Sequence, residues 1–453
     1  MSTKSGITTY RPLASGVTSV SYSEVVRKSL PAFTLGRLTP AIGISSVFVL
    51  MAHKSAEDLP VFSYVLAAAS IISAFFSLIL ATIGNRAASL AQNPPAQRDV
   101  FTGGFTLALI IATVTYLACF SATYFISRAD GLQELDRDAF WALVLIYIAC
   151  TPLLVINTYL QLFLEATGQA SACAKAKTAI TLFGSIVLAI LFAVISSDHF
   201  KYYAMSYFTG TELLTLLYLI KLTKDQRYYS LKSAKKVCRY FFGTGLPIAA
   251  GLSGQKVYFY LLTERLARID TQLVAQLSVF MTVIGLLIIP SLAFSQIHSL
   301  EVSRQVKQSA QCYRAGLSWI IGMMILSGVI LYFCADYVFL AVGGSITDYT
   351  MKLYFTLLIF LTCSSLLSLT IAHLRARGET LIPQLSINAI MLLILTPTLY
   401  SFQFNSADIE TFLLLQSAAA GAGFLLLNAR IYFVHRRDEK TSCALLATEQ
   451  APQ

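Results

Sequence analysis

The chain has 453 residues, of which 56% are hydrophobic and 12% charged, and its formal net charge is +10. A soluble fold of this length cannot bury so much apolar surface, because a single hydrophobic core stops growing well before it. Apolar runs of about 18–25 residues recur along the sequence, and each is long enough to cross a bilayer as a helix. The composition excludes a soluble globular protein and predicts an all-α membrane protein.

We predict twelve transmembrane helices in two six-helix lobes. The first lobe, 30–222, is expected to hold Leu30–Met51, Val61–Ile83, Phe101–Ile126, Phe140–Leu164, Thr178–Ser196 and Tyr202–Ile220. The second lobe, 240–435, is expected to hold Tyr240–Leu262, Leu273–Phe294, Leu317–Ala335, Leu353–Ala372, Ile382–Leu399 and Phe412–Phe433. A segment at 1–29, a basic linker at 223–239 and a tail at 436–453, disordered from Glu439, complete the chain.

The positions of lysine and arginine predict the orientation. The two termini and every second loop hold 24 of the 33 basic residues, whereas the opposite loops hold seven. Because positive loops stay in the cytoplasm, both termini are predicted to be cytoplasmic, and we expect a bacterial inner-membrane protein. This bias accounts for the net charge without a nucleic-acid partner, and the basic segment Lys221–Arg239 is expected to lie against anionic lipid headgroups.

Cysteine and histidine give no indication of a metal site or a cofactor. Seven of the eight cysteines lie in or near predicted spans, without a CxxC pair or a histidine at metal-ligand spacing. We interpret them as small apolar packing residues.

An internal repeat supports the two lobes. The sequence LEATGQ at 164–169 follows the fourth predicted span, and LRARGE at 374–379 follows the tenth, at an offset of 210 residues. The same offset aligns 179–180 with 389–390, both Ala-Ile. Leu-Pro opens the first span at 30–31 and the seventh at 246–247. Repeated lobes of this kind place a substrate site between them and alternate its access, which indicates a transporter.

These motifs resemble the multidrug and toxic compound extrusion (MATE) family, within the superfamily that also holds polysaccharide and lipid-linked-sugar flippases. The resemblance covers about residues 25–435 and rests on four places. They are GLPIAA at 245–250, the stretch Val274–Ser295 with Gln276 and Pro290, LRARGETLIP at 374–383, and its first-lobe copy LEATGQ.

The acids that many members of that family use for coupling to H⁺ or Na⁺ are absent. The positions of the first-, seventh- and tenth-helix carboxylates fall at Ser46, Gln255 and Ser364. The coupling site therefore cannot be transferred from the resemblance.

Two cations lie inside predicted spans instead. Arg37 and Lys256 follow their prolines by six and nine residues in helices that correspond under the repeat. A charge in the bilayer costs about 2.5–3.5 kcal/mol on insertion scales, so it faces a cavity or has a partner. One hypothesis is that both cations face the central cleft, beside Gln255, and attract an anionic substrate. The alternatives are a structural pair with Glu212 and snorkelling of Arg37 toward the cytoplasm.

Glu212 is the clearest carboxylate deep within a predicted span. It could carry a coupling proton through the transport cycle, or it could be a structural partner for one of the cations. Polar and aromatic residues are candidates for the cleft lining, although such tyrosines more often pack between helices or anchor at the interface: Asn157, Gln161, Tyr258, Tyr260 and Gln276. Asn157, Tyr159 and Gln161 cannot all share one helix face.

An enzyme is not expected. Gly251-Leu252-Ser253-Gly254 matches the GxSG pattern of intramembrane serine proteases, but such an enzyme needs a histidine base in the membrane. His298 and His373 lie at cytoplasmic helix ends, so a small-residue packing face explains the pattern better. No Walker A motif is present, so ATP is not hydrolysed by this chain.

The sequence thus predicts a secondary active exporter of an organic, anionic metabolite or drug, acting as a monomer and driven by H⁺ or Na⁺. The alternative is a flippase for a lipid-linked oligosaccharide or polysaccharide precursor, whose pyrophosphate would also bind Arg and Lys.

Overall fold

The computed structural model describes residues 21–126, 137–224, 235–269, 271–341, 350–401 and 409–449. The first half of the chain forms α1 (Tyr22–Lys54), α2 (Leu59–Ile79), α3 (Ile83–Ser89), α4 (Pro94–Ile126), α5 (Arg137–Leu164), α6 (Ala170–Val194) and α7 (Ser197–Lys224). The second half forms α8 (Lys235–Ile269), α9 (Thr271–Arg304), α10 (Ser309–Ala341), α11 (Met351–Ala376), α12 (Leu381–Asn388), α13 (Thr396–Ser401) and α14 (Ile409–Glu449). Short 3₁₀ and π segments join several of them.

Each of the twelve predicted spans falls on a helical segment, which confirms the all-α membrane class. Nine stretches of the described residues are long and apolar enough to cross a bilayer, and one of them, Ala139–Val194, contains both α5 and α6. The two other spans are α7 and α8, which are 28 and 35 residues long and more polar. The eleventh span is divided into α12, a π segment at Ala389–Leu395, and α13.

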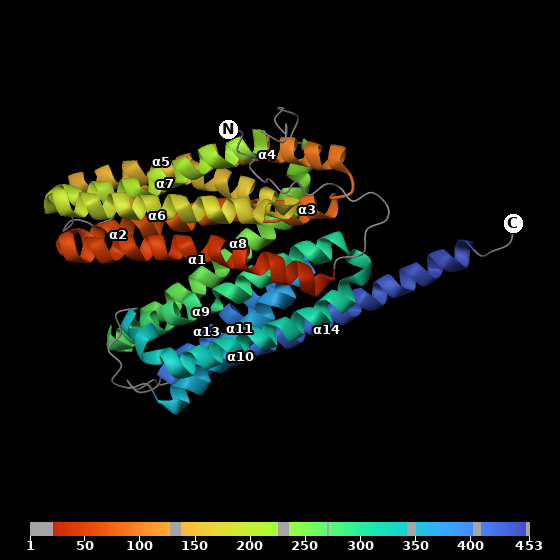
Figure 1. Ribbon diagram of the computed structural model, residues 1–453. Coiled ribbons are helices and arrows are strands. Elements are labelled where there is room, and N and C mark those ends of the chain that lie inside the picture. The colour runs from red at the N-terminus through yellow and green to blue at the C-terminus, as the bar shows by residue number, and fades with distance from the viewer. Residues whose placement is uncertain are drawn as a thin grey trace.

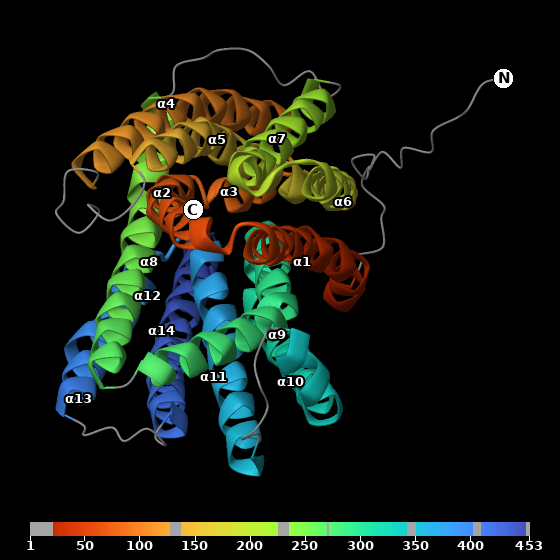
Figure 2. The same cartoon turned by 90° about the vertical axis from the view of Figure 1, so that its left-hand side faces the viewer.

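The helices form two lobes (Figure 1). Helices α1 to α7 make the first lobe, in which α1 packs on α6 and α5 packs on α4 and α7. In the second lobe, α11 packs on α9, α10 and α14. Figure 2 shows the two groups of helices one above the other, with α8 crossing between them. Helix α8 packs on α2 and α4 of the first lobe and on α12 and α13 of the second.

The repeat seen in the sequence has a structural counterpart in two glycines. Gly168 of LEATGQ and Gly378 of LRARGE have φ angles of 90° and 80°, the only positive-φ glycines among the described residues. Each one turns the chain between consecutive helices, α5 to α6 and α11 to α12. A residue with a Cβ is strained in this region, so the same glycine at the same place in both lobes is a backbone requirement.

The prediction for the C-terminal tail is partly wrong. Helix α14 does not end near Phe433 but continues to Glu449, so residues 439–449 are helical rather than disordered. The extension contains no proline or glycine, and residues such as Ala444, Leu445 and Leu446 have high helix propensity. Most of the predicted linker lies outside the described residues.

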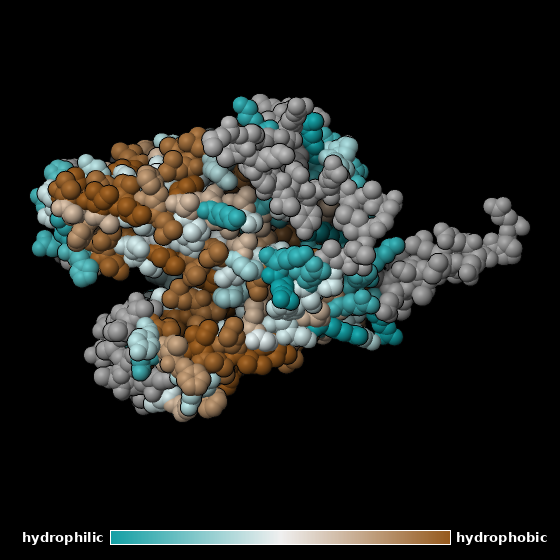
Figure 3. Space-filling model, in the orientation of Figure 1, coloured by the Kyte–Doolittle hydropathy of each residue, from teal (hydrophilic) through white to brown (hydrophobic). Residues whose placement is uncertain are grey.

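The outer surface of both lobes is apolar. Figure 3 shows hydrophobic side chains over the flanks of both lobes. Phe125, Val194, Phe333 and Leu393 are each more than 70% exposed. Water would not tolerate so many exposed large apolar side chains, whereas lipid does. The structure thus describes an integral membrane protein.

The lobes meet at one end of the bundle, which we call the closed end: the start of α1, helix α3, residues 165–169, the start of α8, the end of α9 and residues 376–381. Asn85 of α3 donates to the carbonyl of Ser299 at 3.2 Å, to its hydroxyl at 2.6 Å, and to Ser303 at 2.9 Å. Arg304 of α9 donates to the carbonyl of Ala166 at 2.6 Å. These bonds join the first lobe to the second.

The tightest packing at the closed end is between α2 and α8. A Cβ added at Gly245 would overlap the backbone carbonyl of Ile79, and Thr82 and Thr244 share a 3.0 Å hydrogen bond nearby. The glycine of the GLPIAA motif therefore sets how closely the lobes approach.

We predict that Gly245→Ala separates the lobes at this point and lowers the free energy of unfolding by about 1–3 kcal/mol, because a backbone carbonyl cannot move aside as a side chain can. Gly243→Ala is the matched control, since a Cβ there meets nothing within 4 Å. Thermal unfolding of the purified variants measures both. Equal melting temperatures for the two variants would contradict this account of the contact.

Candidate substrate cleft between the lobes

The lobes separate toward the opposite end of the bundle, which we call the open end. Figure 1 shows the two groups of helices diverging there, and Figure 3 shows the notch between them in the space-filling view. The notch, called the cleft below, lies beyond the contacts that α1 makes with α9 and α2 makes with α8. A residue faces the cleft when it continues a helix face that is buried between the lobes at the closed end.

Lys256 meets this condition. Gly245 and Ala249 lie on the face of α8 that is buried at the contact with α2. Lys256 lies on the same face, two turns beyond Ala249 and about 16 Å along the helix from Gly245. It is exposed, and among the described residues the structure gives it no hydrogen bond or ion pair. Lys256 is therefore an exposed cation on the helix face that continues from the contact between the lobes, with no compensating charge bonded to it among the described residues.

Arg37 lies where α1 leaves α9. Val26 and Phe33 of α1 are buried on the face that also carries Tyr22, whereas Ile44, further along this face, is 42% exposed. Arg37 lies between them, and its guanidinium donates to the carbonyl of Phe33 at 3.0 Å and lies 5.5 Å from the centre of the Phe33 ring. The side chain thus extends one turn toward the closed end, which is the direction of the snorkelling alternative.

A third cation, Arg375 at the end of α11, lies close enough to Arg37 for their charges to repel. It donates to Gln296 of α9 at 2.9 Å, and its Nε has no partner among the described residues. The sequence placed Arg375 in the turn motif and did not identify it as a site residue, because nothing local distinguishes it from the other basic residues of the turns. Arg37 and Arg375 thus lie near each other with no carboxylate bonded to either among the described residues.

The residues near Lys256 have different orientations. Tyr260 follows it by one turn on the same face and is 69% exposed, while Gln255 is half-buried. Tyr258 is fully buried, and its hydroxyl accepts from Gln416 of α14 at 3.1 Å. Tyr258 therefore packs inside the second lobe, so in this conformation the expectation that it lines the cleft is not met.

Glu212 is held inside the first lobe. Asn157 of α5 donates to the Glu212 carboxylate at 2.6 Å and to its carbonyl at 2.8 Å. The expected alternative, a structural ion pair of Glu212 with Arg37 or Lys256, is not seen among the described residues. Asn157 is 4% exposed, and its own Oδ1 has no partner in the described part of the chain, so this carboxylate lies in a polar pocket of an apolar lobe.

Gln161 continues the same face of α5 toward the closed end. It donates to Glu165 at 2.7 Å and accepts from Lys177 of α6 at 3.1 Å. Tyr159 points the other way and donates to the carbonyl of Phe101 at 2.7 Å, as the spacing required. Asn157 and Gln161 therefore belong to a polar stripe on one face of α5, in which each is bonded to residues of the first lobe.

The remaining candidates are Gln276 and the serines at the acid positions of the family. Gln276 is exposed near the open end of α9. Ser46 donates to the carbonyl of Ile42 at 2.9 Å, and Ser364 is half-buried in α11. No group of three His, Cys, Asp or Glu side chains in the described ranges could hold a metal ion.

The GxSG pattern is a packing face. A Cβ at Gly251 would overlap the side-chain oxygen of Gln384, and one at Gly254 would overlap that of Asn388, both in α12. Ser253 donates to the carbonyl of Ala249 within its own helix.

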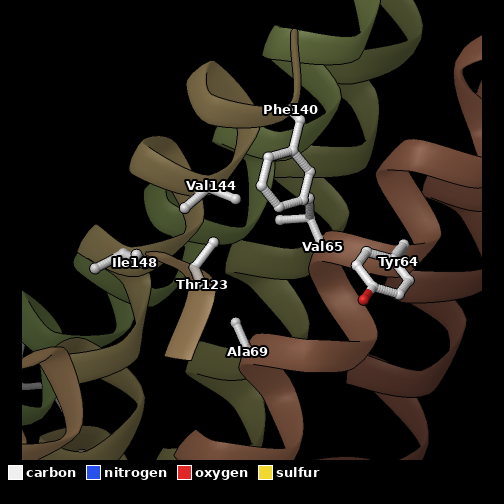
Figure 4. Close-up of a pocket in the computed structure, with 7 residues that line it drawn as sticks. All are labelled: Tyr64, Val65, Ala69, Thr123, Phe140, Val144 and Ile148. Atoms are coloured by element: carbon white, nitrogen blue, oxygen red, sulfur yellow. The ribbon is translucent and has the colours of Figure 1, made fainter. Parts of the chain in front are cut away.

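A separate pocket lies within the first lobe (Figure 4). It is lined by Tyr64, Val65, Ala69, Thr123, Phe140, Val144 and Ile148. Its lining has no charged group, so it does not suit an ionic ligand.

No family model and no curated protein match the sequence. Solved structures are similar. The crystal structure of a MATE mutant superimposes with a TM-score of 0.78 at 15% identity, covering 92% of this chain and 98% of that one. An outward-facing MATE family transporter of the MOP superfamily gives 0.75 at 14% identity, covering 91% and 96%. A Pyrococcus furiosus MOP transporter, described by a reverse polarity of its binding pocket that suggests a different function, gives 0.75 at 15%, covering 91% and 96%.

These comparisons show that the chain has the fold of MATE transporters of the MOP superfamily. At 14–15% identity the fold is what is shared. The resemblance read from the motifs is confirmed at that level.

We predict that Asn157→Ala lowers the free energy of unfolding by about 1–3 kcal/mol, because it leaves the Glu212 carboxylate without its donor inside the lobe. Gln276→Ala, at an exposed position, should change it by less than about 0.5 kcal/mol. Chemical or thermal unfolding in detergent distinguishes them. Equal stability of the two variants would show that the Asn157–Glu212 bond contributes nothing.

Proposed function

We propose that this protein is a secondary active exporter that moves an organic anion out of the cytoplasm by alternating access, with one chain as the working unit. The single observation that carries the proposal is the pair Arg37 and Lys256 at the cleft, with Arg375 behind Arg37 and no carboxylate bonded to any of the three among the described residues.

The orientation follows from charge. The closed end carries the start of α1, the end of α9 and the turn after α11, with Arg304, Arg375 and Arg377, and the sequence assigns most basic residues to this side, so it faces the cytoplasm, at the inner membrane of a bacterium. The cleft then opens to the outside, and the conformation is the one that releases substrate. Export requires that the contacts at Asn85, Gly245 and Arg304 open in the other half of the cycle.

The sign of the charge supports an anionic substrate. Unpaired cations in a low-dielectric cleft attract anions and repel organic cations. The P. furiosus transporter, whose pocket is described by a reverse polarity, supports the view that this fold accommodates more than one polarity.

We assign the coupling proton to Glu212. It is a half-buried carboxylate of the first lobe, and Asn157 can donate to it whether it is charged or neutral. Protonation would remove the charge from the lobe and favour the conformations that exclude water from this carboxyl group.

A flippase for a lipid-linked oligosaccharide is the second candidate, because a pyrophosphate would bind the same three cations. One experiment separates the two functions: untargeted mass spectrometry of the spent medium and the lipid extract of a deletion strain and its parent. A soluble anion lost from the medium and retained in the cells supports the exporter. A lipid-linked sugar that accumulates while the medium is unchanged supports the flippase.

We predict that Arg37→Gln and Lys256→Gln each reduce export of that compound by about tenfold or more, because the cleft loses its attraction for the anion. The folded protein should be recovered in normal amounts. Lys28→Gln is the control, since Lys28 is an exposed cation paired with Glu24 outside the cleft. Unchanged export in both cleft variants would contradict the anion site.

We predict that Glu212→Gln abolishes the dependence of export on an imposed pH gradient, because glutamine accepts the Asn157 bond but cannot bind a proton. Proteoliposomes with the compound identified above provide the assay. Glu264→Gln, which loses an ion pair with the exposed Arg268 at the open end, is the matched control. A gradient dependence equal to that of the unmodified protein would place coupling elsewhere.

A further inference from the structure

Three histidines at the closed end form a hydrogen-bonded chain that ends on the first lobe. The hydroxyl of Tyr22 in α1 lies 2.7 Å from Nδ1 of His298 in α9. Nε2 of His298 lies 3.1 Å from Nδ1 of His373 in α11, and Nε2 of His373 lies 3.3 Å from Nε2 of His435 in α14. Four helices are connected by these contacts, and the first contact joins the two lobes.

The chain of histidines runs from the interior to the edge of the protein. His298 is 0% exposed and His373 is 1% exposed, while His435 is half-buried next to the exposed Arg436. A proton from the cytoplasm therefore reaches the histidines at His435.

The groups that face the histidines bond to other partners in the described part of the protein. Glu301 of α9 is ion-paired with Arg304, and Ser309, which lies 3.4 Å from His435, accepts from Arg377 at 2.7 Å. Tyr313 of α10 packs on the His373 ring and bonds to Thr370 and Asn428. The packed elements also carry Cys312, Arg375, Arg377, Arg314 and the ion pairs of Glu379 with Arg430 and of Glu24 with Lys28.

One set of protonation states satisfies every contact when the three imidazoles are neutral. Each contact needs one hydrogen, and a neutral imidazole supplies one donor and one acceptor. Tyr22 then donates to His298, His298 donates to His373, and His373 donates to His435. In the reverse direction the Tyr22 hydrogen has no acceptor among the described residues, because His298 is the partner that they give this hydroxyl.

A proton added to any of the three histidines reverses the direction of the hydrogen bond between Tyr22 and His298, which joins the lobes. On Nδ1 of His298 it replaces the acceptor that Tyr22 uses. On His373 or His435 it reverses each contact from that residue back to Tyr22, since two N–H groups cannot face each other. In every case Tyr22 must accept rather than donate, and its own hydrogen loses the imidazole acceptor that it has in the neutral set, at a half-buried site.

We propose that His298, His373 and His435 form a proton-binding latch on the cytoplasmic gate, which holds the lobes together when it is neutral and releases them when it binds a proton. Release lets water reach the new charge, so the proton binds more tightly to the state that is open to the cytoplasm. By linkage, cytoplasmic acidification then shifts the protein toward that state. The latch responds to cytoplasmic pH and is distinct from Glu212. It rests on the proposed alternating access, but not on the identity of the substrate.

The movement of the gate can be measured without substrate, so failure of the anion assignment leaves this test intact. Gln92 and Gln308 are exposed at the closed end of the first and second lobes. Spin labels on cysteines at these positions, in an otherwise cysteine-free chain in lipid nanodiscs, report the gate by double electron–electron resonance at pH 8 and pH 5.5. A proton that binds the open state about ten times more tightly raises the ratio of long to short distances up to about tenfold.

Variants separate the latch from general effects of acid. His298→Gln and His373→Gln remove the proton sites and should abolish the pH response. Tyr22→Phe removes the bond between the lobes and should give more of the long distance already at pH 8. His199→Gln, at an exposed histidine bonded to Ser196, should respond like the unmodified chain.

Two results would overturn the proposal: an unmodified chain whose distances do not change with pH, or a pH response that survives in both histidine variants. Should the buried variants fail to fold, His435→Gln at the edge of the protein and Tyr22→Phe provide the same decision.

Discussion

The contact of Gly245 with the backbone of Ile79 is the constraint on which the rest of this structure depends. Without a side chain at that position α8 lies directly on α2, and this brings α3 close enough to α9 for Asn85 to bond to Ser299 and Ser303. Two helices in backbone contact are either packed together or apart, because packed interfaces have discrete arrangements rather than continuous ones. The close approach at one end sets the divergence at the other, and the cleft is its consequence.

The charges are arranged around that contact. Arg37 and Lys256 lie on the helix faces that are buried between the lobes at the closed end and exposed beyond it. In the proposed transport cycle, the closed end would separate and the open end would close around these residues. The same two cations would then lie in the site in both halves of the cycle, which is what a transporter with a fixed site requires. The polar stripe of Asn157, Gln161 and Glu212 moves with the first lobe as a rigid part of it.

Much of the fold could be predicted from the sequence, because a bilayer permits few structures other than helices of a set length and the repeat fixes how they group. The motifs LEATGQ and LRARGE identified both chain reversals, and their glycines have positive φ. The site was harder. Hydropathy predicted that Arg37 and Lys256 lie in membrane spans, but it does not predict which face of a helix a residue occupies. For the same reason it could not predict that Tyr258 is buried in the core. Contacts between residues 62 or more positions apart, such as His298 with His373, and His373 with His435, carry no local signal.

The central claim is tested most directly by measuring the sign of the electrostatic potential in the cleft and the side of the membrane from which the cleft is accessible. Tyr260→Cys, in an otherwise cysteine-free chain, would be treated in intact cells with membrane-impermeant thiol reagents of opposite charge, since Tyr260 is exposed beside Lys256. We predict labelling from the outside, with the anionic reagent reacting about tenfold faster than the cationic one, and loss of that preference when Lys256→Gln is added. Labelling only after the cells are broken, or a faster reaction with the cationic reagent, would contradict an outward-open cleft that attracts anions.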